Sequence, residues 1–500
     1  MRQSILLSII VTVLVFCLHS PALSMQGQAS VSLAKPFKTT LDNGMTVIIE
    51  ENHSAPVVAF QMWVKVGSAD EDENIAGIAH VFEHMLFKGT KKRRVGEIAK
   101  EVDEAGGNIN AFTSYDHTVY HLVLAGRFFD KGLDLIADAI QNSSFDPDEL
   151  AKETEVVLEE LKMGEDDPSR KLYQKLLDSS YTTHPYKRPV IGFPDTKSAF
   201  KDFKPSLDPH KKRTREPEQK KTNGFILNEE IKEARLGLTF HIPDLTHPDI
   251  YAIDALALIL GQGESSRLYQ RLKGKESIVS SISSYAMTPK EPGLFFITSS
   301  LETGNVKKTV AAVLEEIARI KYEGVLGAEL EKAKLNLESE FIYSRETREG
   351  RARQLGYYET SAGGLDYEKR YLEGISKITS SDIRKSIERY LTPENMTIGL
   401  MLPKGEKALL TLDEILKTAG ASVVETEKSY KEGQGMKGTE APFMVKGQET
   451  IKIKLDNGMT LIVKEDHTNP VVAMYAAVEG GIRFEGEKTN GLSNFIEGNF

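Results

Sequence analysis

The chain has 500 residues, a formal net charge of −10 at pH 7 and 40% hydrophobic residues. This length and hydrophobic content predict several domains with ordinary cores. The acidic balance, with no basic groove in view, argues against nucleic acid as a partner. The only cysteine is Cys17, so we expect no stabilising disulfides.

The first 24 residues have the pattern of a secretory signal peptide. Arg2 supplies the positive end, and the apolar run at residues 5–18 is too short to span a bilayer comfortably. The small residues Ala22 and Ser24 suit a cleavage site. We therefore predict an exported protein, periplasmic or extracellular, with no membrane contact after cleavage; an uncleaved anchor is the alternative.

The next informative element is a predicted helix that carries His80, Glu83 and His84 in the sequence HVFEH. Positions i, i+3 and i+4 share one helix face, so both imidazoles could bind one metal with the carboxylate beside it. This spacing is an inverted form of the HExxH zinc-peptidase motif. The alternative is an amphipathic helix whose histidines are half-buried and hydrogen-bonded. The apolar surroundings at residues 78–87 favour the metal, because buried polar groups need partners.

A third ligand is expected on the acidic helix at residues 146–165, which begins with proline and acids in its first turn. Glu153 and Glu160 are two turns apart on one face. The neighbouring buried stripe is predicted to comprise Val156, Val157 and Leu161. By the same periodicity, Glu155 and Glu159 are expected to face solvent.

These segments resemble the inverted zinc metallopeptidases of the pitrilysin, insulysin and mitochondrial-processing-peptidase family, in residues 77–90 (GIAHVFEHMLFKGT) and 153–160 (ETEVVLEE). The resemblance runs from about Phe37 to the end and is closest to exported bacterial members of the four-domain type. It implies an α+β fold of repeated mixed-sheet-plus-helix domains, the processing-peptidase-like fold. It also implies one Zn2+ per chain. The implied ligands are His80, His84 and Glu160, with Glu153 as the supporting catalytic glutamate and Glu159 as the ligand if the register is off by one.

Residues 106–120 form a third matching segment, which reads as a helix end followed by two strands. The resemblance implies that the first strand is an edge strand beside the zinc and pairs with the backbone of the substrate. Asn108, Asn110 and Ala111 are the substrate-binding residues on that match. An ordinary hairpin is the alternative. His117 and His121 lack ligand spacing and are expected to be structural.

The implied reaction is direct hydrolysis of peptide bonds in peptides or unfolded proteins. Zinc lowers the pKa of its bound water, and Glu83 accepts the proton and later delivers it to the leaving amine. No serine or cysteine nucleophile signature is present, in agreement with a mechanism without a covalent intermediate. The alternative is a non-catalytic peptide-binding or assembly subunit of the same fold. A second half or another subunit could close the chamber around the peptide.

An internal repeat divides the chain. The sequence LDNGMT at residues 41–46 recurs at 455–460, an offset of 414, and PVVA at 56–59 recurs at 470–473. The same offset pairs the motif residues His80, Glu83 and His84 with Asn494, Glu497 and Gly498. The second copy therefore lacks both imidazoles and is predicted to be inactive. Because its first long helix should still be running at Phe500, we expect this to be the front part of a longer chain or the product of a premature stop.

The predicted domains are a signal peptide at 1–24, a catalytic domain at 32–204, a basic linker at 205–221, a second, non-catalytic domain at 222–403, a linker at 404–446 and a truncated inactive repeat at 447–500. The segment 260–269 resembles the family's second-domain signature. In many relatives a substrate-binding Arg and Tyr follow, but Lys275, Glu276 and Ser280 stand there in this chain. By comparison with the end of the second domain, roughly one strand and two helices are missing after residue 198. Their loss would remove a central support of the first sheet and puts the activity of this chain in question.

Overall fold

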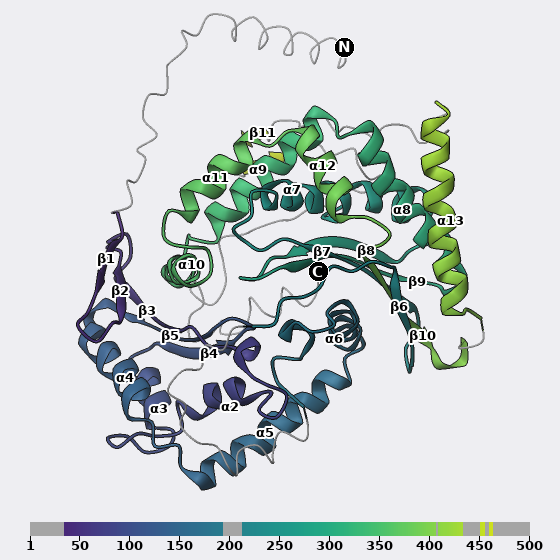
Figure 1. Ribbon diagram of the computed structural model, residues 1–500. Coiled ribbons are helices and arrows are strands. Elements are labelled where there is room, and N and C mark those ends of the chain that lie inside the picture. The colour runs from purple at the N-terminus through teal and green to yellow at the C-terminus, as the bar shows by residue number, and fades with distance from the viewer. Residues whose placement is uncertain (1–34, 194–212, 407–408, 434–450, 456–459, 464–500) are drawn as a thin grey trace, which may run out of the picture.

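The computed structural model describes residues 35–193, 213–406, 409–433, 451–455 and 460–463 (Figure 1). Two domains of helices packed on sheets lie side by side, so the predicted α+β class is confirmed. Among the helices of these residues, none has both the length and the apolar character needed to cross a bilayer. The predicted signal peptide and the repeat counterparts of the zinc motif lie outside the described residues.

The first domain is a three-stranded antiparallel sheet with helices on one face. Its elements are β3 (Val57–Val64), α2 (Ile78–Met85), α3 (Glu97–Glu104), β4 (Asn108–Thr113), β5 (Thr118–Ala125), α4 (Phe129–Asn142), α5 (Pro147–Glu165) and α6 (Pro168–Ser180). The strand order is β3-β5-β4, which leaves β4 at an edge. The core lies between this sheet and helices α3 and α4, where Leu122, Leu124 and Leu135 are fully buried.

The second domain has a larger, mixed sheet in the order β6-β10-β7-β9-β8. Its elements are β6 (Asn223–Glu229), β7 (Ala234–Ile242), α7 (Ile250–Gly261), β8 (Ser281–Met287), β9 (Gly293–Leu301), α8 (Val306–Glu323), α9 (Gly327–Tyr343), α10 (Arg348–Thr360), α11 (Tyr367–Lys377), α12 (Ser380–Tyr390) and β10 (Met396–Pro403). β10 is parallel to β6, and the other pairs are antiparallel. Helix α7 is buried on almost all sides, as its nearly unbroken apolar sequence requires.

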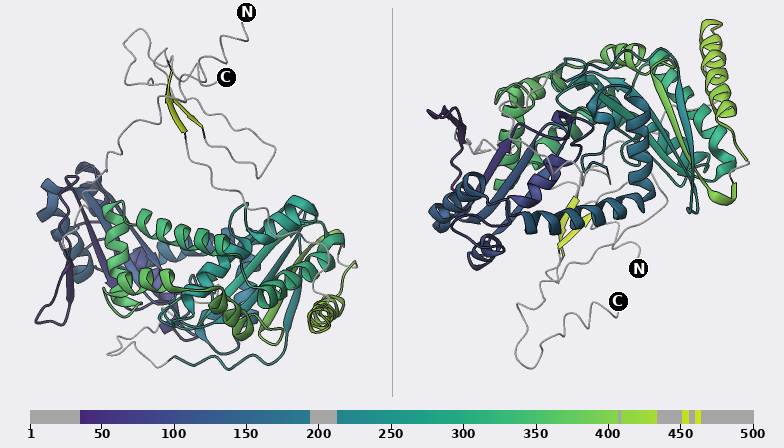
Figure 2. Two further views of the ribbon diagram at one scale, coloured as in Figure 1. Left: turned by 90° about the horizontal axis from the view of Figure 1, so that it is seen from above. Right: turned by 60° about the horizontal axis from the view of Figure 1, so that its bottom comes forward.

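The two domains exchange one helix each. Helix α6 of the first domain packs on β7 and β10 of the second, and α10 of the second packs on β3 of the first. Both contacts need glycine. A Cβ at Gly399 would lie 2.7 Å from Leu176 of α6, and a Cβ at Gly356 of α10 would lie 2.0 Å from the indole of Trp63. The view from above shows the green helices of the second domain reaching over the purple strands of the first (Figure 2).

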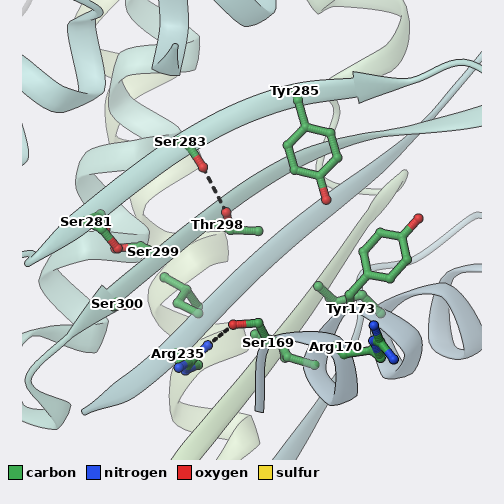
Figure 3. Close-up of a pocket in the computed structure, with 13 residues that line it drawn as sticks. Ser169, Arg170, Tyr173, Arg235, Ser281, Ser283, Tyr285, Thr298, Ser299 and Ser300 are labelled. Carbon is green, nitrogen blue, oxygen red and sulfur yellow. Dashed lines mark hydrogen bonds between the residues drawn. The ribbon is translucent and has the colours of Figure 1, made fainter. Parts of the chain in front are cut away.

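Beside α6, the second sheet leaves a cavity of about 420 Å3 (Figure 3). Its wall on the sheet is mostly hydroxyl groups, and the side chains of Ser283 and Thr298 are hydrogen-bonded to each other at 3.1 Å. On the other side, Arg235 donates a hydrogen bond to Ser169 at the start of α6. The exchanged helix therefore covers the sheet only in part.

Two short hairpins reflect the internal repeat. β1 (Phe37–Thr40) pairs with β2 (Thr46–Ile49), and β11 (Ile451–Lys454) pairs with β12 (Thr460–Val463), in the same register at the same offset of 414. In the second domain β10 lies between β6 and β7, whereas no strand among the described residues lies between β2 and β3. The predicted absence of a strand and two helices after residue 198 stays a prediction, because residues 194–212 are outside the described part of the chain.

The prediction of a linker at 404–446 is wrong for residues 412–431. Residues 412–431 form helix α13 (Leu412–Lys431), which packs along α8 at the outer side of the second domain (Figure 1). Thr411 caps the helix through the backbone N–H of Glu414 at 3.3 Å. Ile415 and Ala419, one turn apart, are buried against the domain. Frequent charged residues hid this narrow apolar stripe.

The basic linker predicted at 205–221 is not uniformly solvated. Residues 205–212 lie outside the described residues, but the Arg213 side chain is only 10% exposed. It forms ion pairs with Asp70 at 3.0 Å, with Asp116 at 2.5 Å and with Glu291 at 3.3 Å. Arg213 thus ties the connecting segment to both domains, a role that a run of basic residues does not reveal in sequence.

Candidate metal centre

The structure brings His80 and His84 of α2 together with Glu160 of α5. One ligand atom from each residue lies within 4.8 Å of the others. The Nε2 atom of His80 is 3.7 Å from Glu160 Oε2, and the Nε2 atom of His84 is 3.8 Å from Glu160 Oε1. All three side chains are partly accessible, so a small ligand can reach them.

Local packing holds the two helices in this arrangement. Val81 and Met85 on the buried side of α2 pack against Val157 of α5, which turns the histidines towards Glu160. At the start of α2, the buried carboxylate of Glu71 accepts hydrogen bonds from the backbone N–H groups of residues 77 and 79, both at 2.7 Å. Glu71 therefore satisfies two N–H groups that the first helical turn leaves open. Burial raises its pKa to about 7.

Glu153 lies beside His84 and not among the group that could hold a metal. Its Oε2 atom is 3.1 Å from Nδ1 of His84, and its Oε1 atom is 2.6 Å from Nζ of Lys88. Burial alone would raise the pKa of Glu153, but the hydrogen bonds from Lys88 and His84 bring the pKa below its usual value. A charged Glu153 that accepts a proton from Nδ1 leaves the lone pair of His84 on Nε2, the atom that faces Glu160.

The three converging residues fit a zinc ion. Two imidazoles and one carboxylate are a common zinc donor set, with room for a fourth ligand. Burial, together with the neighbouring His84, lowers the pKa of His80 to about 4, so this imidazole is neutral at physiological pH, as a ligand must be. Tetrahedral zinc with bonds of about 2.0–2.1 Å places its ligand atoms roughly 3.3 Å apart. The separations of Glu160 from the two imidazoles, 3.7 and 3.8 Å, are close to that value, and the three ligand atoms lie within 4.8 Å of one another.

Glu83 faces the first sheet at the same end of α2. The hydroxyl group of Thr113, the last residue of β4, donates a hydrogen bond to Glu83 Oε2 at 2.6 Å. Burial raises the pKa of Glu83 above its usual value, although this hydrogen bond opposes the shift. A carboxylate of raised pKa is a better proton acceptor at neutral pH than an ordinary one.

The predicted substrate strand is the edge strand β4. Within the described residues, β4 pairs with β5 alone. Ala111 packs into the core, whereas Asn108 and Asn110 lie on the opposite, exposed face, as the alternation of a strand requires. The backbone N–H of Ala111 is taken by the side chain of Asn110 at 2.8 Å, so a peptide on this edge would have to displace that contact.

Four residues near the candidate metal group, Glu159, Val156, His117 and His121, lie outside it. The Glu159 side chain is 67% exposed and pairs with Lys162, so Glu160 and not Glu159 joins the histidines. The prediction that Val156 belongs to the buried stripe is wrong. Val156 is 44% exposed, because it lies one turn before Glu160 on the open side of α5. His117 and His121 are buried on β5 or beside it and are outside the metal group.

No sequence pattern indicated Glu71, Lys88 or Thr113 as partners of the site. A negative residue a few positions before a helix is a known capping signal, but Glu71 precedes α2 by seven residues and reaches it through a loop. Thr113 and Lys88 act through contacts between elements, which spacing along the chain does not encode.

Comparison with known proteins identifies the family. Residues 46–193 match the model of the insulinase family of peptidases (M16), and residues 195–337 match the model of the M16 inactive domain. The chain belongs to peptidase family M16. The predicted resemblance to the pitrilysin and insulysin family is therefore confirmed.

Relatives of this M16 chain carry the name zinc protease. YmxG of Bacillus subtilis is 27% identical over 403 residues, which cover 73% of this chain and 98% of that protein. A zinc protease of Rickettsia felis is 29% identical over 379 residues, covering 69% of this chain and 92% of its own length. PqqE of Helicobacter pylori is 27% identical over 423 residues, covering 74% and 94%. These names support a metallopeptidase at the level of the family, with zinc as its metal.

Solved structures show the same fold. A protease from Helicobacter pylori superimposes with a TM-score of 0.67 at 25% identity, covering 74% of this chain and all of that one. An M16 inactive domain from Pseudomonas fluorescens gives a TM-score of 0.64 at 19% identity, covering 74% and 98%. The match to both structures agrees with the two-domain arrangement of this chain.

Proposed function

We propose that this chain is a zinc-dependent endopeptidase that hydrolyses peptides or unfolded proteins, with one zinc ion per chain. The observation that carries the proposal is the convergence of His80, His84 and Glu160 with Glu83 on the same helix end. When bound, zinc supplies the Lewis acidity that activates water and the scissile carbonyl. Glu153 orients His84 for this task through its 3.1 Å contact with Nδ1.

Glu83 is the proton carrier in this proposal. Its carboxylate accepts a proton from the attacking water and delivers it to the amine that leaves. The raised pKa suits both steps, since the group must take up and release a proton near neutral pH. The hydroxyl of Thr113 fixes the carboxylate at 2.6 Å and so limits its rotation.

The substrate lies extended along the open edge of β4, beside Asn108, Asn110 and Ala111. A strand edge binds the peptide backbone through main-chain hydrogen bonds, which only an extended or unfolded segment can offer. This requirement supports peptides or unfolded proteins as substrates over folded ones. Thr113 links the substrate strand to the general base, because it belongs to β4 and its hydroxyl group donates a hydrogen bond to Glu83.

The composition of residues 1–24 supports export as part of the proposal, to the periplasm or the outside of the cell. A second half or another subunit would close the chamber over the open side of the site. Nucleic acid has no place in the proposed activity.

The test compares Glu83→Gln with the wild type. The variant should retain one zinc per chain by elemental analysis and lose cleavage of a quenched peptide by roughly 10²- to 10⁴-fold, the usual contribution of a general base. Glu159→Gln makes the same change of charge on the exposed side of α5 and should leave both unaffected. Cleavage by Glu83→Gln at the wild-type rate would refute the role of Glu83. A wild type that binds zinc and cleaves nothing would instead favour the peptide-binding or assembly subunit.

A further inference from the structure

A cavity of about 560 Å3 lies where helices of the second domain face the first sheet. Helices α7, α9, α10 and α11 surround it, and Figure 1 shows α10 next to β3. The first domain contributes Trp63 of β3, Phe112 of β4 and His117. The residues from the second domain that matter here are Asp254, Glu340, Phe341, Tyr358, Tyr367 and Tyr371.

Asp254 is the only charged residue on α7, which is otherwise apolar. The hydroxyl of Tyr371 donates a hydrogen bond to its Oδ2 atom at 2.7 Å. Burial raises the pKa of Asp254 to about 7, and the neighbouring charge of Glu340 acts in the same direction. Across the described residues, neither carboxylate forms an ion pair with a lysine, arginine or histidine. Glu340 is exposed, but Asp254 is a desolvated carboxylate without a cation, which is unfavourable, and such groups are enriched at binding sites.

The wall around Asp254 is aromatic. The Tyr371 ring stacks on Phe341 at 5.6 Å and on Tyr367 at 5.7 Å, and Tyr367 contacts Tyr358 at 5.3 Å. The faces of such rings attract cations, and their bodies accept aliphatic chains. Aromatic walls with carboxylates therefore suit a ligand group that has a positive end and an apolar stem.

The basic groups of the lining, Arg353 and His117, do not neutralise the carboxylates of Asp254 and Glu340. The Arg353 guanidinium lies 4.8 Å over the Phe112 ring and its Nη2 atom is 3.9 Å from Glu349, so its contacts are with groups other than Asp254. Burial lowers the pKa of His117 to about 4, which makes this imidazole neutral at physiological pH.

The cavity occupies the second domain's counterpart of the metal centre. The order β3, α2, β4, β5, α4, α5 in the first domain corresponds to β7, α7, β8, β9, α8, α9 in the second. Helix α7 thus takes the place of α2, and α9 takes the place of α5. Glu340 is the fourteenth residue of α9, and Glu160 is the fourteenth residue of α5. A carboxyl group thus stands in the second domain where Glu160 stands in the first, whereas Asp254, the fifth residue of α7, corresponds by the same count to Phe82 of α2.

The cavity also opens to the strand that we assign to substrate. Phe112 lines it and precedes Thr113, the residue that holds Glu83. A peptide along β4 projects alternate side chains to the face of Phe112. We propose that this cavity binds a lysine or arginine side chain of the peptide substrate near the scissile bond, an inference that rests on the proposed function. Basic side chains carry both the charge and the apolar stem that the lining selects.

The test uses quenched peptides in which a single lysine is moved through an otherwise neutral sequence, with norleucine at the same position as the uncharged match. The wild type should favour lysine at one position. Asp254→Asn should lower kcat/KM for that peptide roughly 10- to 100-fold, as expected for one lost charged contact, and should leave the norleucine peptide unchanged. Glu340→Gln should act in the same direction. Glu338→Gln, on the same helix but outside the lining, is the matched control and should behave as the wild type.

A binding measurement separates this inference from the proposed function. N-acetyl-lysine amide and N-acetyl-norleucine amide are titrated by NMR into full-length Glu83→Gln protein, with and without Asp254→Asn. Binding of the lysine probe alone, lost in Asp254→Asn, supports the cavity even if no peptide is ever cleaved. Cleavage without preference for lysine at any position, together with equal binding of both probes, overturns the cavity assignment and leaves the proposed peptidase intact.

Discussion

Replacing Glu153 by glutamine tests how His84 is held at the metal centre. Glu153 is 7% exposed and touches both His84, at 3.1 Å, and Lys88, at 2.6 Å. Glutamine keeps the size of the side chain but removes its charge. It also replaces one acceptor oxygen with an NH2 group, so it cannot accept hydrogen bonds from His84 and Lys88 in the same way.

The expected effect follows from these contacts. Loss of a hydrogen bond to the second nitrogen of a metal-ligating histidine typically costs 10- to 100-fold in metal affinity, or about 1.4 to 2.7 kcal/mol. Lys88 also loses its partner, but its side chain is 30% exposed and water can solvate the ammonium group. We therefore expect weaker zinc binding with only a small loss of folding stability.

The assay is the zinc dissociation constant, measured by competition with a chelator, beside the thermal midpoint of the metal-free protein. Glu159→Gln is the control, since the Glu159 side chain is 67% exposed and contacts Lys162 alone among the described residues. An unchanged zinc affinity in Glu153→Gln would show that Glu153 does not orient His84. A large fall in the midpoint of the metal-free protein with unchanged affinity would assign Glu153 to stability instead.

Three further predictions concern stability. The pKa of Asp254 is raised to about 7 in the folded protein, so its contribution to folding stability is present below the unfolded pKa of about 4 and is lost as pH rises through 7. The free energy of unfolding in urea, taken relative to Asp254→Asn, should therefore fall by roughly 4 kcal/mol between pH 4 and pH 8. Arg213→Met leaves buried carboxylates unpaired and should cost about 3 to 5 kcal/mol in the same assay, and an effect below about 1 kcal/mol, the range of surface pairs, would contradict its burial. Gly356→Ala places a Cβ 2.0 Å from the only tryptophan, Trp63. It should shift the tryptophan fluorescence and lower the free energy of unfolding by about 1 to 3 kcal/mol. The control Gly420→Ala, with open space around the new Cβ, should do neither.

The candidate site was predictable where the geometry is local. The spacing of His80, Glu83 and His84 fixes one helix face, and the separation of Glu153 from Glu160 fixes a second. That these faces meet follows from Val81 and Met85 packing on α5, a contact between elements that spacing cannot specify. The family resemblance supplied that step. The role of Thr113 depends on how β4 lies against α2, so no local pattern indicated it.

The same division applies to the fold. Helices α7 and α8 and strands β7 and β9 have long apolar runs bounded by turns, which is the pattern that predicts such elements from sequence. Helix α13 was missed, since a stripe of small buried residues such as Ala419 carries little hydrophobic signal. The exchange of α6 and α10 between domains was also missed. It depends on glycines that leave room for Leu176 on one side and Trp63 on the other. A glycine within a strand or helix can have several structural causes, so it does not by itself predict such a contact.

In the proposed peptidase, the exchanged helix α10 would make the second domain part of the substrate site. It covers the face of the first sheet away from α2, where Glu349 lies 3.2 Å from His121 and accepts a hydrogen bond from Gln61 at 3.1 Å through its carbonyl group. Arg353 of the same helix lies over Phe112 of β4, the proposed substrate strand. The second domain thus forms the wall behind β4, although it carries none of the candidate zinc ligands. Changes in α10 should therefore alter which peptides are cleaved and leave zinc affinity unchanged, because the candidate zinc ligands lie on α2 and α5, on the other side of the strand.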